Sequence, residues 1–201
     1  MVEGALGAIP ENAIGMLNIA NRNTNRLIAL VNDILDMEKI ESGSMEFNFQ
    51  TVNLSNLVKE AVETNKGYAE EFDVDFILGT IIPEATVYGD ADRLVQVVSN
   101  LLSNAAKFSP SGSEVTISVS RENGIATVSI RDRGVGIAEE LRDHIFEKFT
   151  QADSSDARAK GGTGLGLNIS KSIIENHGGG IDFSSNENAG STFFFTLPLI
   201  A

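Results

Sequence analysis

Residues 90–108 read DADRLVQVVSNLLSNAAKF, and this stretch predicts an amphipathic helix around which the rest of the fold is organised. Asp90 is a residue type that favours a helix N-cap. Apolar residues then recur at three- and four-residue spacing, which places them on one helix face. These positions are Leu94, Val97, Val98, Leu101, Leu102 and Ala105. We therefore expect this face to pack against a core and the opposite face to meet solvent or a ligand.

The opposite, polar face carries side chains that suit a phosphate and its metal ion. At about 100° per residue, Asn100, Asn104 and Lys107 lie within about 60° of one another. A carboxamide oxygen suits a hard cation such as Mg²⁺, and an ammonium group suits the accompanying phosphate. Taken alone, an ordinary exposed polar face explains the pattern equally well.

On both sides of this helix the sequence alternates as β-strands do. We expect strands near residues 45–49, 75–78, 86–88, 115–120, 126–131, 181–183 and 192–197. Glu122-Asn123-Gly124 predicts a hairpin turn, and further helices are expected after Asn53 and over 139–149 and 167–176. Because helices and strands do not alternate regularly, the sequence predicts an α+β fold, a two-layer α/β sandwich.

A long N-terminal helix precedes this sandwich. Apolar residues form a seam at heptad-like spacing, and Gly43 follows the expected helix end. The seam consists of Ile14, Leu17, Ile28, Val31 and Leu35. One helix cannot bury its own stripe, so we expect two chains to pair through residues 10–42, the alternative being a helix folded back on the main domain. The expected domains are residues 1–43 and 44–201.

Composition narrows the classes of function. The 201 residues carry a formal net charge of −13, and such a field repels nucleic acid and anionic lipid. Cysteine is absent from the sequence, which excludes disulfides and thiol chemistry. Since no apolar run approaches the roughly 20 residues that span a bilayer, we expect a soluble, cytoplasmic fragment without membrane contact. A membrane anchor in a longer parent protein stays open.

Two glycine motifs follow the central helix in the sequence. Asp132-Arg-Gly134-Val-Gly136 ends an expected strand, where glycines let backbone approach a flat ligand and the carboxylate accepts from an exocyclic amine. Gly162-Thr-Gly-Leu-Gly166 runs into a helix, where free N–H groups and the helix dipole favour an anion. A plain turn and a flexible surface loop are the alternative interpretations of the two motifs.

Together these motifs resemble those of sensor histidine kinases. Asn100 to Phe108 resembles the N box, Asp132 to Gly136 the first glycine box, Ile145 to Phe149 the F box, Gly162 to Leu167 the second glycine box, and Gly190 to Phe193 the closing strand. The resemblance covers about residues 45–199. Residues 10–42 resemble the second helix of the family's dimerisation and phosphotransfer hairpin.

The resemblance implies ATP and Mg²⁺ as ligands and a role for each motif position. Asp132 would bind the adenine amine, Asn104 would ligate the metal, and Asn100, Lys107 and Arg158 would be the catalytic residues. Residues 151–161 would belong to a mobile ATP lid. The implied nucleotide-binding residues are Asn100, Asn104, Lys107, Phe108, Asp132, Gly134, Gly136, Ile137, Phe149, Gly162, Thr163, Gly164, Leu165 and Gly166.

One family feature is missing, because no segment resembles the phosphoacceptor motif. Of the two histidines, His144 is expected on the surface, and His177 at a helix C-terminus, where positive charge is favourable. The implied reaction is transfer of the ATP γ-phosphoryl group to a histidine of a separate hairpin and onward to a response regulator receiver domain. This fragment would not phosphorylate itself.

Two other functions stay open at this stage. Gyrase-like ATPases share the implied fold, but they use a glutamate base where this chain has Asn100, and a carboxamide cannot take a proton from water. A nucleotide-sensing interaction module without transfer activity is also compatible with the missing acceptor.

Overall fold

The structure, a computed structural model, describes residues 11–150, 162–187 and 189–200. Its centre is a five-stranded sheet in the order β2-β4-β5-β7-β6, in which β2 and β4 are parallel and the other neighbours are antiparallel. The strands are β2 (Val74–Ile81), β4 (Ser113–Glu122), β5 (Ile125–Arg131), β6 (Gly180–Ser185) and β7 (Ser191–Pro198). A short antiparallel ribbon pairs β1 (Gln50–Asn53) with β3 (Thr86–Gly89).

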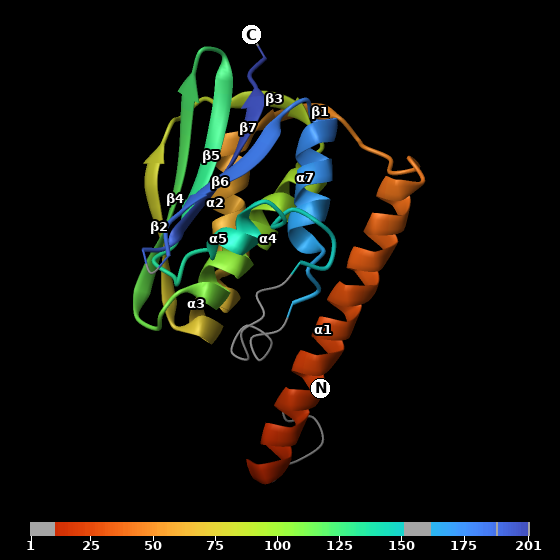
Figure 1. The fold of residues 1–201 in the computed structure, drawn as a ribbon, viewed down its shortest axis with the longest axis vertical. Helices are drawn as coiled ribbons and strands as arrows, with labels where there is room; N and C mark the ends of the chain where they lie inside the picture. Colours follow the sequence, from red (N-terminus) through yellow and green to blue (C-terminus); the bar gives the residue numbers. More distant parts are fainter. Residues whose placement is uncertain (1–10, 151–161, 188, 201) are drawn as a thin grey trace.

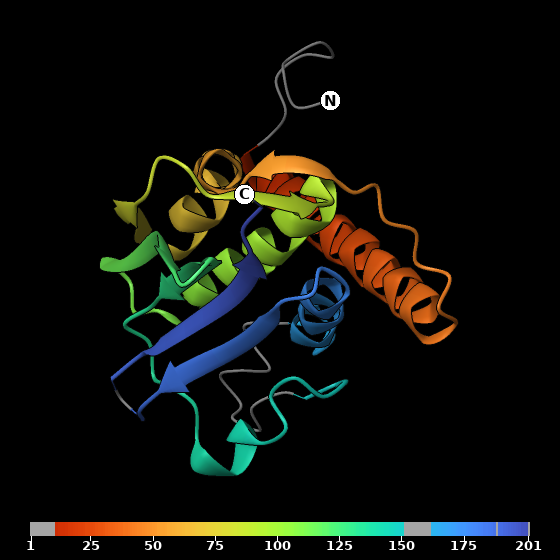
Figure 2. The ribbon, with the colours of Figure 1, turned by 90° about the horizontal axis from the view of Figure 1, so that it is seen from above.

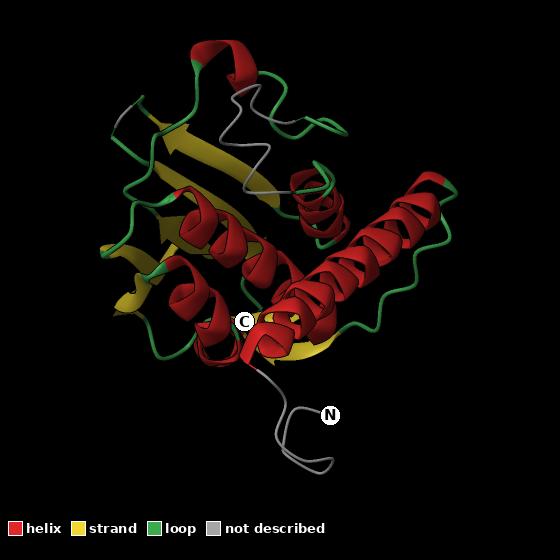
Figure 3. Cartoon of the chain, turned by 90° about the horizontal axis from the view of Figure 1, so that it is seen from below, coloured by secondary structure: helices red, strands yellow, loops and turns green. Residues whose placement is uncertain are grey.

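The helices cover one face of the sheet (Figures 2 and 3), so the α+β two-layer sandwich is confirmed. They are α2 (Leu54–Thr64), α3 (Lys66–Phe72), α4 (Ala91–Phe108), the short α5 (Glu139–Arg142) and α7 (Gly166–Asn176). The apolar faces of α4 and α7 pack on inward side chains of β4, β5 and β7 to form one main core. All six apolar positions expected on α4 are buried.

Local signals in the sequence position these elements. Asp90 caps α4 by accepting a hydrogen bond from the Arg93 N–H at 3.1 Å, and Asn53 caps α2 in the same way through the Asn56 N–H at 3.0 Å. Asn123 and Gly124 have φ angles of 50° and 78°, as the tight β4–β5 hairpin turn requires. The expected helix caps and hairpin are therefore confirmed.

Helix α1 (Glu11–Glu41) stands beside the sandwich and extends away from it (Figure 1). Among the described side chains, those of its C-terminal part pack on the domain, with Met37 and Ile40 making the apolar contacts. The seam residues Ile14, Leu17, Ile28, Val31 and Leu35 remain between 42% and 54% exposed. Folding back on the domain therefore covers one end of the helix and leaves the seam uncovered.

Two expected elements differ in the structure. Residues 45–49 alternate in burial but form no strand, because the Asn48 N–H donates to the Asp90 carboxylate instead of to a neighbouring strand. The helix expected over 139–149 ends at Arg142, and turns continue from there to Phe149. Phe149 has a φ of 62°, which is incompatible with a right-handed helix.

Candidate functional site

The polar face of α4 lies against the glycine loop that precedes α7. A β-carbon on Gly166 would lie 2.3 Å from Asn100 Oδ1, and one on Gly162 would lie 2.8 Å from Lys107 Nζ. Only glycine permits the first of these approaches, because the carboxamide occupies the space of any side chain at residue 166. Segments more than 50 residues apart in sequence thus meet at one place.

The loop after β5 closes the other end of α4. A β-carbon on Gly134 would lie 2.6 Å from the Phe108 carbonyl oxygen and 2.8 Å from Asp132 Oδ1. Residues 100–108 and 132–136, which are separated in the sequence, are therefore in contact. We name this the Asp132 end of the site, and we name residues 162–166 with the facing residues of α4 the glycine-loop end.

Asp132 is buried, with 6% of its surface exposed. Its Oδ1 accepts hydrogen bonds from the Gly134 N–H at 2.7 Å and from the Ser191 N–H at 3.1 Å. Burial raises the pKa of the Asp132 carboxyl, and these backbone hydrogen bonds act in the opposite direction. Both neighbours bond Oδ1, which leaves Oδ2 as the oxygen that can accept from a ligand's amine.

Backbone groups and two serine hydroxyls stabilise the Asp132 end. Gly136 has a φ of 74°, and a β-carbon there would lie 2.2 Å from the Asn186 carbonyl oxygen. The Ile137 N–H donates to Ser185 Oγ at 2.9 Å, and Ser185 Oγ lies 2.8 Å from Ser191 Oγ. Our sequence reasoning missed both serines, since each occupies an ordinary position in an alternating strand.

On α4, Asn100 and Lys107 have defined partners. Asn100 Nδ2 donates to Ser170 Oγ of α7 at 3.0 Å. Lys107 Nζ lies 4.9 Å from the centre of the Phe108 ring. Asn100, Asn104 and Lys107 are all half-buried. Asn100 and Lys107 therefore border the glycine-loop end without being removed from solvent, and Asn104 lies one helical turn from Asn100 on α4.

The glycine loop is held from two directions. Thr163 Oγ1 accepts from the Leu165 N–H at 3.2 Å and donates to Asp33 Oδ2 of α1 at 2.7 Å. The Phe149 N–H donates to the Gly164 carbonyl at 2.9 Å, while the Phe149 side chain is largely exposed. Leu165 is buried in the core, so it anchors the loop from beneath.

Acidic residues of α1 connect that helix to the site. Burial raises the pKa of Asp33, and the nearby Asp36 charge adds to the effect while the Thr163 hydrogen bond opposes it. Asp36 accepts from Arg93 at 3.0 and 3.1 Å and from Gln96 at 2.8 Å. Glu41 pairs with Lys148. Sequence reasoning missed these contacts, because on α1 alone the acids belong to an ordinary polar face.

Some expectations concern residues that lie elsewhere or outside the description. Arg158 and the expected lid over 151–161 lie outside the described residues. His144 is on the surface as expected. His177 ends α7 as expected, but its Nε2 accepts a hydrogen bond from the Asp90 N–H at 2.9 Å. The expected positive charge is therefore wrong, because an accepting imidazole is neutral.

Neither a preformed metal cage nor a membrane span occurs in the described part of the chain. No group of three or more His, Cys, Asp or Glu side chains is arranged there to hold a metal ion. Within the same residues, no helix is long and apolar enough to cross a bilayer.

Comparison with known proteins places the site in context. The family described as histidine kinase-, DNA gyrase B- and HSP90-like ATPases matches residues 89–201. The sensor histidine kinase WalK of Bacillus subtilis is 38% identical over 189 residues, which cover 90% of this chain and 30% of WalK. This chain thus spans about a third of the length of that relative.

Solved structures agree on the fold. Full-length ShkA in complex with AMPPNP superposes with a TM-score of 0.79 at 26% identity, covering 96% of this chain and 40% of ShkA. The histidine kinase ThkA in complex with the response regulator protein TrrA gives a TM-score of 0.72 at 28% identity, covering 96% of this chain and 53% of ThkA. Both likenesses extend over α1 as well as the sandwich.

Proposed function

This chain belongs to the family of histidine kinase-, DNA gyrase B- and HSP90-like ATPases, and we propose that it is the ATP-binding catalytic portion of a sensor histidine kinase. Its reaction would be transfer of the γ-phosphoryl group of ATP to a histidine outside this chain. The observation that carries the proposal is the convergence of the buried Asp132 carboxylate, the glycine loop and the Asn100–Lys107 face of α4. The AMPPNP complex of ShkA supports a nucleotide as the ligand.

We assign each end of the site to one part of ATP. At the Asp132 end, Oδ2 would accept from the adenine amine, with Gly134, Gly136, Ile137 and Phe108 around the base. At the glycine-loop end, Lys107 and backbone N–H groups of the loop that leads into α7, other than the Leu165 N–H that already bonds Thr163, would meet the phosphates. Thr163, Gly164, Leu165, Gly166 and the exposed Phe149 complete this end, and Arg158 of the lid would assist transfer.

Magnesium fits this site as an ion that arrives with the nucleotide. Mg²⁺ usually binds one or two protein oxygens together with substrate phosphates and water, and the half-buried Asn104 carboxamide, with Asn100 beside it, supplies such oxygens. When bound, the ion would neutralise phosphate charge during transfer. The chain's own residues would hold and orient ATP, which is most of what phosphoryl transfer requires.

Asn100 favours transfer over hydrolysis. Its carboxamide donates to Ser170 Oγ at 3.0 Å, and a neutral amide has no basic atom that could take a proton from water. An imidazole nucleophile needs no such base. A gyrase-like ATPase and a nucleotide-sensing module both predict no phosphohistidine, so the product distinguishes the three functions.

The proposed partners follow from the exposed seam and from the relatives. We infer that residues 1–43 are part of a phosphotransfer hairpin and residues 44–201 the catalytic domain, and that two chains pair through residues 10–42. The exposure of Ile14, Leu17, Ile28, Val31 and Leu35 supports this pairing, because apolar stripes seek partners. The ThkA–TrrA complex supports a response regulator as the later phosphate acceptor. A cytoplasmic location is proposed because the substrate is ATP.

Binding and transfer test the proposal together. Calorimetry should show Mg²⁺-dependent binding of ADP and AMPPNP, and labelled ATP should slowly phosphorylate an added histidine-containing hairpin. Asn104→Ala should remove the metal dependence of binding and reduce transfer at least tenfold, since a neutral ligand oxygen is lost. The matched control is Asn56→Ala, an exposed asparagine on α2.

The outcomes separate the alternatives. Nucleotide binding with release of free phosphate and no labelled hairpin would favour the ATPase, and binding without either product would favour the sensing module. Failure to bind nucleotide would reject the proposal. An equal loss for Asn104→Ala with and without Mg²⁺ would reject Asn104 as the metal ligand.

A further inference from the structure

The segment that joins α1 to the sandwich is fastened to the end of α7. In this linker, residues 44–49, the Phe47 and Phe49 rings lie 5.5 and 4.8 Å from the His177 ring. The Phe49 ring also stacks on Tyr88 of β3 at 5.5 Å. A segment without secondary structure thus places two aromatic side chains on one buried imidazole.

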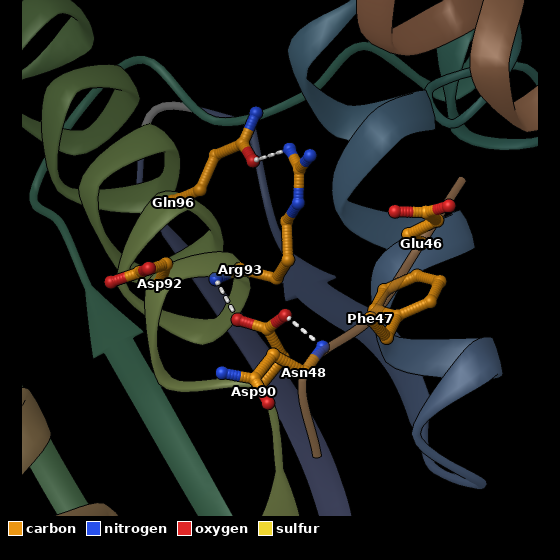
Figure 4. Close-up of a pocket in the computed structure, with 7 residues that line it drawn as sticks. All are labelled: Glu46, Phe47, Asn48, Asp90, Asp92, Arg93 and Gln96. Carbon is orange, nitrogen blue, oxygen red and sulfur yellow. Dashed lines mark hydrogen bonds between the residues drawn. The ribbon is translucent and has the colours of Figure 1, made fainter.

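Hydrogen bonds join the same three places. The Asp90 N–H donates to His177 Nε2 at 2.9 Å, and His177 Nδ1 donates to the Ile173 carbonyl at 2.7 Å. Asp90 Oδ2 in turn accepts from the Asn48 N–H of the linker at 2.7 Å. Figure 4 shows the Asp90 carboxylate between the Asn48 and Arg93 backbone nitrogens. His177, Asp90 and the linker form one connected unit.

This unit requires a neutral imidazole. Protonated His177 would carry a hydrogen on Nε2, which would then face the Asp90 N–H, so two donors would meet and the bond would be lost. The ring has little room to turn away, because it packs closely on Gly89. A β-carbon added to Gly89 would lie only 2.8 Å from His177 Cδ2. Protonation would therefore displace the ring together with the residues that pack on it.

We propose that neutral His177 holds the linker against the sandwich in a pH-dependent way. Protonation of His177 releases residues 44–49 and thereby changes the position of α1 relative to the sandwich. Because α1 supplies Asp33 to Thr163 and Asp36 to Arg93, release of the linker would also loosen the glycine-loop end of the site. The inference does not depend on what the site binds.

Neighbouring charges are compatible with this switch. The ionisable groups near these contacts in the sequence are Glu46 of the linker, Tyr88 of β3, Asp90, Asp92 and Arg93 at the start of α4, and Glu175 at the end of α7, while Lys107 and Lys171 lie further along α4 and α7. Burial lowers the pKa of His177 below its ordinary 6.5, while the Ile173 hydrogen bond and the Asp90 charge act in the opposite direction. Because the pKa of His177 is lower in the folded state than in the unfolded state, the stability that neutral His177 contributes is fully present above pH 6.5. This stability is lost as the pH falls through the lowered pKa.

A titration by NMR tests the proposal, since the chain has only two histidines. Between about pH 8 and pH 5, the His177 imidazole and the Asn48 amide should shift with one midpoint. Below that midpoint the protection factor of the Asn48 amide, which is its exchange rate corrected for the intrinsic pH dependence, should fall at least tenfold. His144→Ala, which removes the exposed histidine, should leave this transition in place. His177→Phe keeps a ring but cannot titrate, and should abolish the transition.

Distance measurement tests the movement of α1. The sequence has no cysteine, so spin labels can be placed at Asn32→Cys on α1 and Ser120→Cys on β4, both exposed positions. The distance distribution should broaden below the midpoint in the unsubstituted background and with His144→Ala. Titration of His177 with an unchanged Asn48 amide or an unchanged distribution would overturn the proposal, and this result needs no folded His177 variant.

Discussion

The Asp132 end and the glycine-loop end of the site are built in different ways. At the Asp132 end, backbone N–H groups from two chain segments bond one buried carboxylate oxygen, and glycines press against carbonyl groups. At the glycine-loop end, half-exposed side chains of α4 face a loop that a threonine connects to α1. The first end is part of the sandwich, while the second depends on how α1 is docked.

Because of this difference, we expect the Asp132 end to set the affinity for the ligand and the glycine-loop end to respond to the position of α1. Buried groups that are already held in place lose little entropy when a ligand binds. The Asp132 end should therefore supply most of the selectivity for the adenine ring. At the glycine-loop end the side chains of α4 are only half-buried, so this end should open at lower free energy. Binding of the base can therefore persist while the geometry around the phosphates changes.

The largest expected effect comes from filling backbone space at the Asp132 end. Gly136→Ala should lower the free energy of unfolding by about 2–4 kcal/mol, because a β-carbon would clash with the Asn186 carbonyl at a positive φ. Gly162→Ala is the matched control, since its β-carbon would meet only the end of the flexible Lys107 side chain. Denaturant unfolding measures both. Equal losses would contradict the contrast between the two ends.

A smaller effect is expected from changing the carboxylate itself. Asp132→Asn should weaken ADP binding by about 1–3 kcal/mol, because the amide can turn a donor toward the adenine amine or toward the Gly134 N–H. Calorimetry measures the change, and Asp75→Asn, an exposed acid on β2, is the control. Unchanged affinity would reject the assignment of adenine to the Asp132 end.

The smallest effect is expected at the contact with α1. Burial raises the pKa of Asp33, so its ionised form is disfavoured in the folded protein and would also repel phosphate. Asp33→Asn keeps an oxygen for the Thr163 hydroxyl and should tighten AMPPNP binding by about 0.5 kcal/mol at neutral pH. The gain should shrink as the pH falls through the raised pKa of Asp33, where the native carboxyl is neutral too.

Asn32→Asp controls for charge on α1, since residue 32 is exposed beside Asp33. It should leave nucleotide affinity unchanged. Weaker binding of AMPPNP by Asp33→Asn would mean that the Asp33 carboxylate helps to form the glycine-loop end instead of opposing phosphate.

Local chemistry allowed much of this protein to be predicted from its sequence. Helix α4, its Asp90 cap and the Asn123-Gly124 hairpin depend on periodicity and on backbone preferences within a few residues. The two glycine motifs predicted where backbone would approach closely, and Gly134 and Gly166 do lie against α4. Local rules also gave errors where a distant partner competes, as at residues 45–49 and in the charge of His177.

The sequence by itself determined most of the elements, their buried faces and the motif residues, because these follow from interactions between near neighbours. Only the tertiary structure decided that Thr163 bonds Asp33 and that Asp36 bonds Arg93. It also decided that the linker packs on His177. These pairs are between 57 and 130 residues apart in the sequence. The topology of the fold brings them together, and no local pattern encodes that topology.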